Sequence, residues 1–253
     1  MSVTFKNASI KNATISPRIV YDSSLVLAID PANPLSYSGS GVTSNNLITP
    51  DVFTLTNGAG YSSLNGGVFT FAGDNDYIES NNSISYSLAN GFTLMQWVYL
   101  NSYAGGTYSQ ILFNNTNNFI NFYFGGSTRL RWETHLSNAM SSSSDVPLNT
   151  WVLFTGTMST LSNIVTGTDS YGIGTARIYL NGVINGSPTS LAASPSIDIN
   201  ITLGSYTYID QSTSLRTLVP SNSNIGQTLF YTRELSSAEI LQNYNALRYR
   251  YGV

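Results

Sequence analysis

The chain has 253 residues, enough for one large domain with a sizeable core, and only 9% of them are charged. An average soluble domain carries about 25% charged residues; here Ser, Thr, Asn and Gly take their place. The formal net charge is −3 at pH 7 and there is no basic stripe, which argues against duplex nucleic acid as a partner. Cys is absent, so disulfides and thiolate metal sites are ruled out.

The first twenty residues contain a near-duplicate pentapeptide, KNASI at 6–10 followed by KNATI at 11–15. Two interpretations remain open: an extended arm with chance similarity, and an attachment arm that adds a strand to a partner chain. This region has no apolar core of signal-peptide length, and no apolar run approaches the ~20 residues of a membrane span. We expect residues 1–20 to form an extended attachment arm, with no membrane span and no standard secretion signal.

Short strand-like runs follow, separated by clusters of Asn, Gly and Ser that favour turns. The longest is 92–100 (FTLMQWVYL), whose two faces are both largely apolar, so it is predicted to lie centrally in a sheet. Asn181-Gly182 predicts a type I′ hairpin, and Trp151 is predicted to fill core space. Strands are predicted at 25–29, 68–71, 92–100, 111–113, 119–124, 130–133, 151–157, 176–180, 183–184, 199–203 and 228–231.

Three polar stretches, 137–149, 160–175 and 205–224, are predicted to be long loops. Many short strands with regular turns and a single late helix are typical of an antiparallel β-sandwich. Loops on such a rigid scaffold are where binding tends to occur.

The last part of the chain predicts the only convincing helix, over 236–250. Ser236 and Glu239 have the spacing of a capping box, and Leu235 and Ile240 that of a hydrophobic staple. Gly252 is a suitable terminator. One apolar face is predicted, made by Ile240, Tyr244, Leu247 and Tyr251.

Six pieces of the chain agree in order and spacing with a known family. They are LVLAIDPANP (25–34), NGGVFTFAGDNDYIE (65–79), GFTLMQWVYL (91–100), NTWVLFTGTM (149–158), ARIYLNGVING (176–186) and the terminal IGQTLFYTRELSSAEILQNYNALRYRYG (225–252). Together they resemble the concanavalin A-like lectin/glucanase superfamily, in the laminin G-like version found in tailed-phage virion proteins. The resemblance implies an all-β fold over 21–253, an antiparallel jelly-roll β-sandwich with one C-terminal helix.

The resemblance also implies a rim site for Ca²⁺, which prefers six to eight oxygen ligands. The family's FDGxxDY-type motif matches at Gly73, Asp76 and Tyr77, whereas Ala72 stands where the family has Asp. The alternative is a tight turn in which Asp76 caps backbone amides. The candidate metal ligands are Asp74, Asp76 and Asp30.

Catalysis finds little support in the sequence. Glucanases of this fold carry Glu-x-Asp-x-x-Glu on one strand, and no such run occurs here. Glu133 is a lone carboxylate with His135 two residues further on. The first interpretation is a structural pair on the surface, and the second is an acid–base pair in a polysaccharide hydrolase or lyase. We expect a protein that is not an enzyme.

Sugar binding uses aromatic platforms together with polar donors and acceptors. The same aromatic residues also pack at sheet edges and interfaces, so both interpretations stay open. The candidate platforms are Tyr103, Tyr108, Trp132, Tyr171, Tyr206 and Tyr208.

Taken together, these features predict a non-enzymatic structural protein on the surface of a phage virion, as a capsid decoration protein or a tail or fibre adhesion domain. Its expected partners are capsid or tail proteins, held through the N-terminal arm, and host or environmental glycans, bound by exposed loops. Particle symmetry would make it a homo-oligomer or a multicopy protein. The alternative is a carbohydrate-binding module of a bacterial surface or secreted protein.

Overall fold

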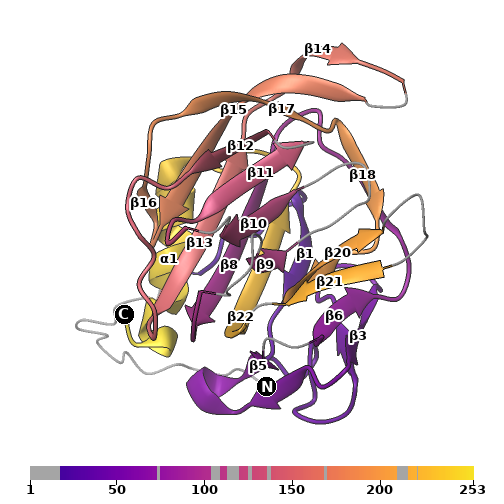
Figure 1. The fold of residues 1–253 in the computed structure, drawn as a ribbon, viewed down its shortest axis with the longest axis vertical. Helices are drawn as coiled ribbons and strands as arrows, with labels where there is room; N and C mark the ends of the chain where they lie inside the picture. The colour runs from indigo at the N-terminus through magenta and orange to yellow at the C-terminus, as the bar shows by residue number, and fades with distance from the viewer. Residues whose placement is uncertain are drawn as a thin grey trace, which may run out of the picture.

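A computed structural model (Figure 1) describes residues 18–72, 75–103, 109–112, 120–124, 127–135, 138–167, 170–209, 216–220 and 222–253. Two large antiparallel sheets account for most of this part of the chain. The fold is therefore the predicted β-sandwich, mostly strand, with one C-terminal α-helix.

The larger sheet has ten strands and is centred on β8. Its order is β14 (Ser162–Val165), β15 (Tyr171–Leu180), β13 (Trp151–Met158), β8 (Phe92–Leu100), β22 (Asn222–Tyr231), β5 (Val68–Ala72) and β4 (Gly60–Ser62), with β1 (Leu25–Ile29) paired to β22, and β16 (Val183–Ile184) and β17 (Thr189–Ala193) paired to β15.

The second sheet has eight strands. Its order is β12 (Asn138–Ser141), β11 (Arg131–His135), β10 (Asn121–Phe124), β9 (Ser109–Leu112), β19 (Thr202–Leu203), β6 (Tyr77–Ser80), β3 (Val52–Thr56) and β2 (Thr43–Asn45). Two separate pairs flank the sheets: β7 (Ile84–Ser87) with β18 (Ser196–Ile199), and β20 (Ser205–Ile209) with β21 (Arg216–Pro220). A 3₁₀ turn, Leu64–Gly66, precedes β5.

The main core lies between the two sheets and is rich in aromatic rings. Trp132 of β11 reaches across it, and its indole Nε1 donates to the carbonyl of Thr157 in β13 at 3.3 Å. A Cβ at Gly156 would stand only 2.6 Å from Cε2 of that ring. Gly156 therefore makes the room that the largest core side chain of the second sheet occupies.

A second core lies on the other face of the ten-stranded sheet, under helix α1 (Ser237–Tyr251). Trp97 of β8 stacks on Tyr251 and Tyr244 of the helix, with ring centroids 4.3 and 5.7 Å apart. Figure 1 shows α1 behind β13, on the opposite side from β10 and β11. Because β8 is covered on both faces, its two apolar faces and its central position agree with the prediction.

The predicted helix signals are confirmed. Ser236 accepts from the amide of Glu239 while the Glu239 side chain accepts from the amide of Ser236, which completes the capping box. Gly252 ends the helix in the left-handed region at φ 73°. The hairpin at Asn181 and Gly182 is also as predicted, since both have the positive φ of a type I′ turn, 51° and 79°.

The three predicted loops were wrong in part, because 137–149 holds β12, 160–175 holds β14 and the start of β15, and 205–224 holds β20 and β21. All four side chains of β14 are exposed, so its sequence shows no apolar alternation. In β15 a Cβ at Gly174 would lie 2.6 Å from the sulfur of Met158. Because glycine is common in loops, glycines that allow close packing within a strand make that part of the sequence look like a loop.

Only the end of the predicted arm, 1–20, falls within the described residues, which begin at Arg18. There the chain runs along α1. Gln242 Nε2 donates to the Arg18 carbonyl at 2.7 Å, and the Val20 amide donates to Asn243 Oδ1 at 2.6 Å. In the part of the chain that is described, we find no helix long and apolar enough to cross a membrane.

Candidate functional site

The outward face of the eight-stranded sheet carries a cluster of polar and aromatic side chains at β10 and β11. Strand alternation turns Trp132 inward, into the core between the sheets, and its neighbours outward. The register places Asn121 opposite Glu133 and Tyr123 opposite Arg131. Two residues from each strand therefore meet on one patch, which we call the β10–β11 cluster.

The β10–β11 cluster is compact and partly hydrogen-bonded. Asn121 Nδ2 donates to Glu133 Oε2 at 3.2 Å, and Cζ of Arg131 lies 5.0 Å from the centroid of the Tyr123 ring. Asn121 is 0% and Glu133 9% exposed. Among the described residues the side-chain oxygen of Asn121 has no hydrogen-bond partner. A buried acceptor without a donor costs about 1–3 kcal/mol, and because Asn121 is fully buried this oxygen is closed to a ligand in the described conformation.

The strand pair β20–β21 lies against β9, the neighbour of β10. This places the backbones of Tyr206 and Tyr208, both in β20, near the cluster. Their side chains lie outside the described residues, as do Tyr108 and the side chain of His135.

Three other predicted platforms occupy different places. Trp132 is 0% exposed and wedged between the sheets, so it offers no ring face to a sugar, and that prediction is corrected. Tyr103 donates through its hydroxyl to the Val146 carbonyl, and its ring packs 5.8 Å from that of Phe124. Tyr171 opens β15 in the other sheet, paired with Val165 of the edge strand.

The described candidates for Ca²⁺ do not form a suitable donor set. Asp30 Oδ1 and Oδ2 accept from Nη1 of Arg250 at 2.7 and 3.0 Å, so a guanidinium already occupies this carboxylate. Asp76 is 2% exposed and accepts from the Ala72 amide at 2.6 Å, as the turn alternative expects. Asp74 lies outside the described residues. Within the described ranges, no three acidic, His or Cys side chains gather in a way that could hold a metal ion.

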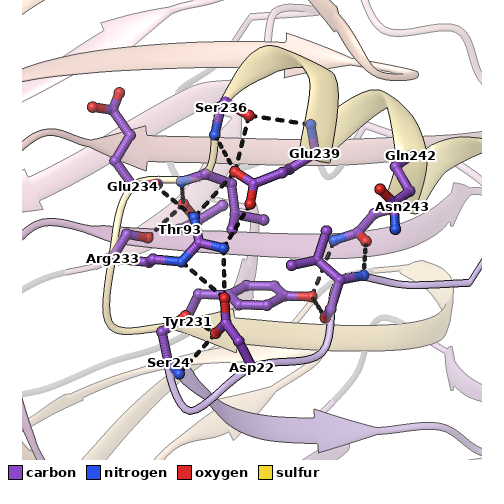
Figure 2. A network of polar contacts seen from close by, with 12 residues as sticks. Asp22, Ser24, Thr93, Tyr231, Arg233, Glu234, Ser236, Glu239, Gln242 and Asn243 are labelled. Carbon is purple, nitrogen blue, oxygen red and sulfur yellow. Dashed lines mark hydrogen bonds and ion pairs between the residues drawn. The ribbon is translucent and has the colours of Figure 1, made fainter.

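A second polar network joins the chain before β1 to the start of α1 (Figure 2). Arg233 contacts Asp22 at 2.6 Å and Glu239 at 2.7 Å. The hydrogen bond from Arg233 lowers the pKa of Glu239 to about 2. Burial alone would raise the pKa of Asp22, but hydrogen bonds from Ser24 and Arg233 outweigh it and lower this pKa to about 2. We call Arg233, Asp22 and Glu239 the Arg233 clamp.

The Arg233 clamp is structural, because it holds residues 18–24 against the helix. Tyr231 donates to the Val20 carbonyl at 2.9 Å and accepts from Asn243 at 3.0 Å. The sequence could have suggested this cluster only through the capping box, since Asp22 and Arg233 lie 211 residues apart.

The architecture, two packed antiparallel sheets with polar side chains on the outward face of one, is that of a lectin-like β-sandwich. Solved structures with this fold include a sialidase of Trypanosoma rangeli, 13% identical with a TM-score of 0.60, over 94% of this chain and 36% of that one. The binding domain of botulinum neurotoxin DC in complex with SialylT is 11% identical, with a TM-score of 0.62, over 90% of this chain and 52% of that one. The receptor-binding domain of botulinum neurotoxin type G is 15% identical, with a TM-score of 0.55, over 88% and 51%.

At these identities the likeness concerns the fold alone, and the chain spans between about a third and a half of each of these proteins. A search of curated protein sequences found no match. The family profile described as the concanavalin A-like lectin/glucanases superfamily matches residues 72–241. The chain therefore belongs to this superfamily, as its motifs predicted.

Proposed function

We propose that this chain is a non-enzymatic, carbohydrate-binding domain and that the β10–β11 cluster is its glycan site. The observation that carries the proposal is the partly exposed Arg131, whose Cζ lies 5.0 Å from the centroid of the Tyr123 ring on the face of the sheet away from the core. A sugar hydroxyl supplies a donor and an acceptor at once. The Arg131 guanidinium can donate to such a hydroxyl, and the Asn121–Glu133 pair borders it on the same two strands.

The arrangement of carboxylates supports binding rather than hydrolysis. The two-carboxylate mechanism that most glycoside hydrolases use needs two carboxyl groups about 5–9.5 Å apart. Within the described strands of this sheet, the other carboxylate belongs to Glu79 of β6, which accepts from Thr202. Glu133 stands four strands away in β11, which at about 4.8 Å per strand is about 19 Å. A single carboxylate paired with Asn121 is suited to holding a hydroxyl.

We further propose that the domain is carried on a phage particle by its N-terminal arm and acts in many copies. The resemblance to virion proteins supports this, and so does the firm attachment of Arg18 and Val20 to α1, which gives an arm a fixed base. Repetition on a particle would raise avidity for a glycan that each copy binds weakly. Its partners would then be capsid or tail proteins and surface glycans.

The glycan proposal is tested on an array probed with the protein linked into multimers. Arg131→Gln should weaken binding about tenfold, the effect of losing one hydrogen bond from a charged group. Arg129→Gln is the matched control, because the Arg129 side chain lies in an exposed ion pair with Asp145, outside the cluster. No bound glycan, or equal loss in both variants, would refute the site.

The arm proposal is tested by deleting residues 1–17, which keeps Arg18 and Val20 on the helix. The shortened protein should fold with an unchanged melting temperature and fail to enter particles, as measured by mass spectrometry of purified virions. Normal incorporation of the shortened protein into particles would refute attachment through the arm. Absence of the full-length protein from particles would favour the bacterial carbohydrate-binding module instead.

A further inference from the structure

A second concave site lies on the opposite side of the molecule from the β10–β11 cluster. It is an open pocket of about 380 Å³ between β15 and the start of α1. Arg177 and Tyr179 reach it because they alternate with Ala176 and Ile178, which face the core between the sheets. Its lining residues are Arg177, Tyr179, Glu234, Leu235, Ser236 and Ser237.

The centre of the pocket is an ion pair between Arg177 and Glu234, whose side chains are 28% and 29% exposed. Nη1 of Arg177 donates to Oε1 of Glu234, and Thr157 donates to the same oxygen at 3.2 Å. Figure 2 shows the Glu234 carboxylate pointing away from Arg233 and the helix cap. Its position is therefore set by β13 and β15 rather than by the Arg233 clamp.

This pairing leaves specific groups available to a ligand. Among the described residues, Oε2 of Glu234 and the Nε and Nη2 hydrogens of Arg177 have no partner. An acceptor and donors thus stand side by side, the pattern that two adjacent hydroxyls satisfy: one donates to the carboxylate and the next accepts from the guanidinium. Ser236 and Ser237 line the same pocket, with their hydroxyls already hydrogen-bonded to Glu239 and Tyr179.

The charge and size of the pocket narrow the class of ligand. The ion pair cancels its own charge, so an anionic ligand gains no surplus attraction there and would meet Glu234. The volume lies at the lower end of small-molecule sites, about 300–1,000 Å³. Outside the lining, Ile184 pairs across the strand from Tyr179, and Leu241 packs beside Gly182; both are partly exposed, at 46% and 43%. Apolar side chains next to a polar pocket suit the C–H face of a sugar ring.

We propose that this pocket binds the neutral terminal sugar of a glycan through the Arg177–Glu234 pair. The domain would then hold two sugar sites on opposite faces. The new site does not depend on the β10–β11 cluster, and either can fail without the other.

The test is NMR titration of the ¹⁵N-labelled protein with the methyl glycosides of glucose, galactose and mannose, and with glucuronic acid as the anionic counterpart. At least one neutral glycoside should shift the amides of Tyr179, Ser236 and Ser237 saturably, and glucuronic acid should bind more weakly. Glu234→Gln should weaken that binding about tenfold. Ser237→Tyr, which fills the pocket but keeps the ion pair, should abolish it.

Ser40→Tyr, at an exposed loop position, is the matched control and should bind normally. Melting temperatures show whether each variant is folded, and Ser237→Tyr keeps the test decisive if Glu234→Gln is unstable. Arg131→Gln should leave these shifts unchanged. The proposal is overturned if no glycoside shifts these amides, if glucuronic acid binds as tightly, or if Ser237→Tyr binds like the wild type. Shifts confined to the β10–β11 cluster would overturn this site and leave the proposed function standing.

Discussion

Gly226 of β22 lies directly against the phenol of Tyr251, the last residue of α1. A Cβ at Gly226 would stand 2.7 Å from Cζ of that ring, and the neighbouring Gln227 amide donates to the Tyr251 hydroxyl at 2.9 Å. The end of the helix is thus seated on a point in the strand where only a hydrogen atom fits. This explains how a helix at the end of the chain is held so closely on the larger sheet.

Gly226→Ala should destabilise the protein by about 1–3 kcal/mol, the usual cost of overpacking a tight contact. The free energy of unfolding in urea, followed by tryptophan fluorescence, measures the change. Tyr251→Phe removes the nearest ring substituent, so the double variant should lose less stability than the two single changes summed. If the losses in unfolding free energy of the two single variants simply add up in the double variant, the contact between Gly226 and Tyr251 is not the cause of the destabilisation.

Asp30→Asn should be strongly destabilising, because Arg250 would lose its carboxylate partner in a largely buried place. The side chains of Arg250 and Asp30 are 16% and 14% exposed, and breaking such a pair costs about 3–5 kcal/mol. Asp145→Asn is the matched control, since the Arg129–Asp145 pair is 53% and 68% exposed. That change should cost less than about 1 kcal/mol. Equal effects in urea unfolding would contradict the distinction.

The same variant tests the role of Asp30 in Ca²⁺ binding. The guanidinium of Arg250 already satisfies both carboxylate oxygens of Asp30. We therefore expect any effect of Ca²⁺ on the melting temperature to be the same in the wild type and in Asp30→Asn. Scans with millimolar CaCl₂ and with EDTA are compared for both proteins. An increase that requires Asp30 would show that the ion displaces Arg250.

The Arg233 clamp should make stability depend on pH at the acid end. Folding lowers the pKa of Glu239 from 4.5 and that of Asp22 from 3.8, each to about 2. A lowered carboxyl pKa stabilises the fold above the unfolded-state pKa, and this contribution is lost as pH falls from about 4.5 toward 2. The three side chains are 30–40% exposed, so solvent keeps the effect modest.

The clamp is checked by measuring the free energy of unfolding at several pH values between 6 and 2 for the wild type and for Arg233→Gln. The wild type should lose stability more steeply below pH 4.5, and the two curves should converge toward pH 2. Arg129→Gln should follow the wild-type curve. Parallel curves for wild type and Arg233→Gln would mean that the pair does not couple to folding.

Features set by neighbouring residues were the ones that could be predicted from the sequence. The capping box of Ser236 and Glu239 spans four residues, and the Asn181-Gly182 turn spans two. The strand at 92–100 could be recognised because both of its faces are apolar.

The rest depends on register and on distant pairing. Asn121 and Glu133 meet only because β10 and β11 align, and Asp30 and Arg250 are 220 residues apart. Trp132 was misassigned as a sugar platform because an indole serves equally well on a surface or in a core, and the small size of Gly156 on the facing strand decided which. A sequence pattern indicates which environments suit a residue, whereas the residues packed against it in the fold determine which of these environments it occupies.

The hydrogen bonds that tie Arg18 and Val20 to α1 also have a mechanical meaning. If the domain is held by its first residues while a bound surface pulls on its far face, tension enters the fold at these two positions. It passes through Asn243 and the Arg233 clamp into the connection between β22 and α1, near the centre of the ten-stranded sheet. Such a force would shear α1 along the ten-stranded sheet, so many contacts between the helix and the sheet would have to break at the same time before any strand separated.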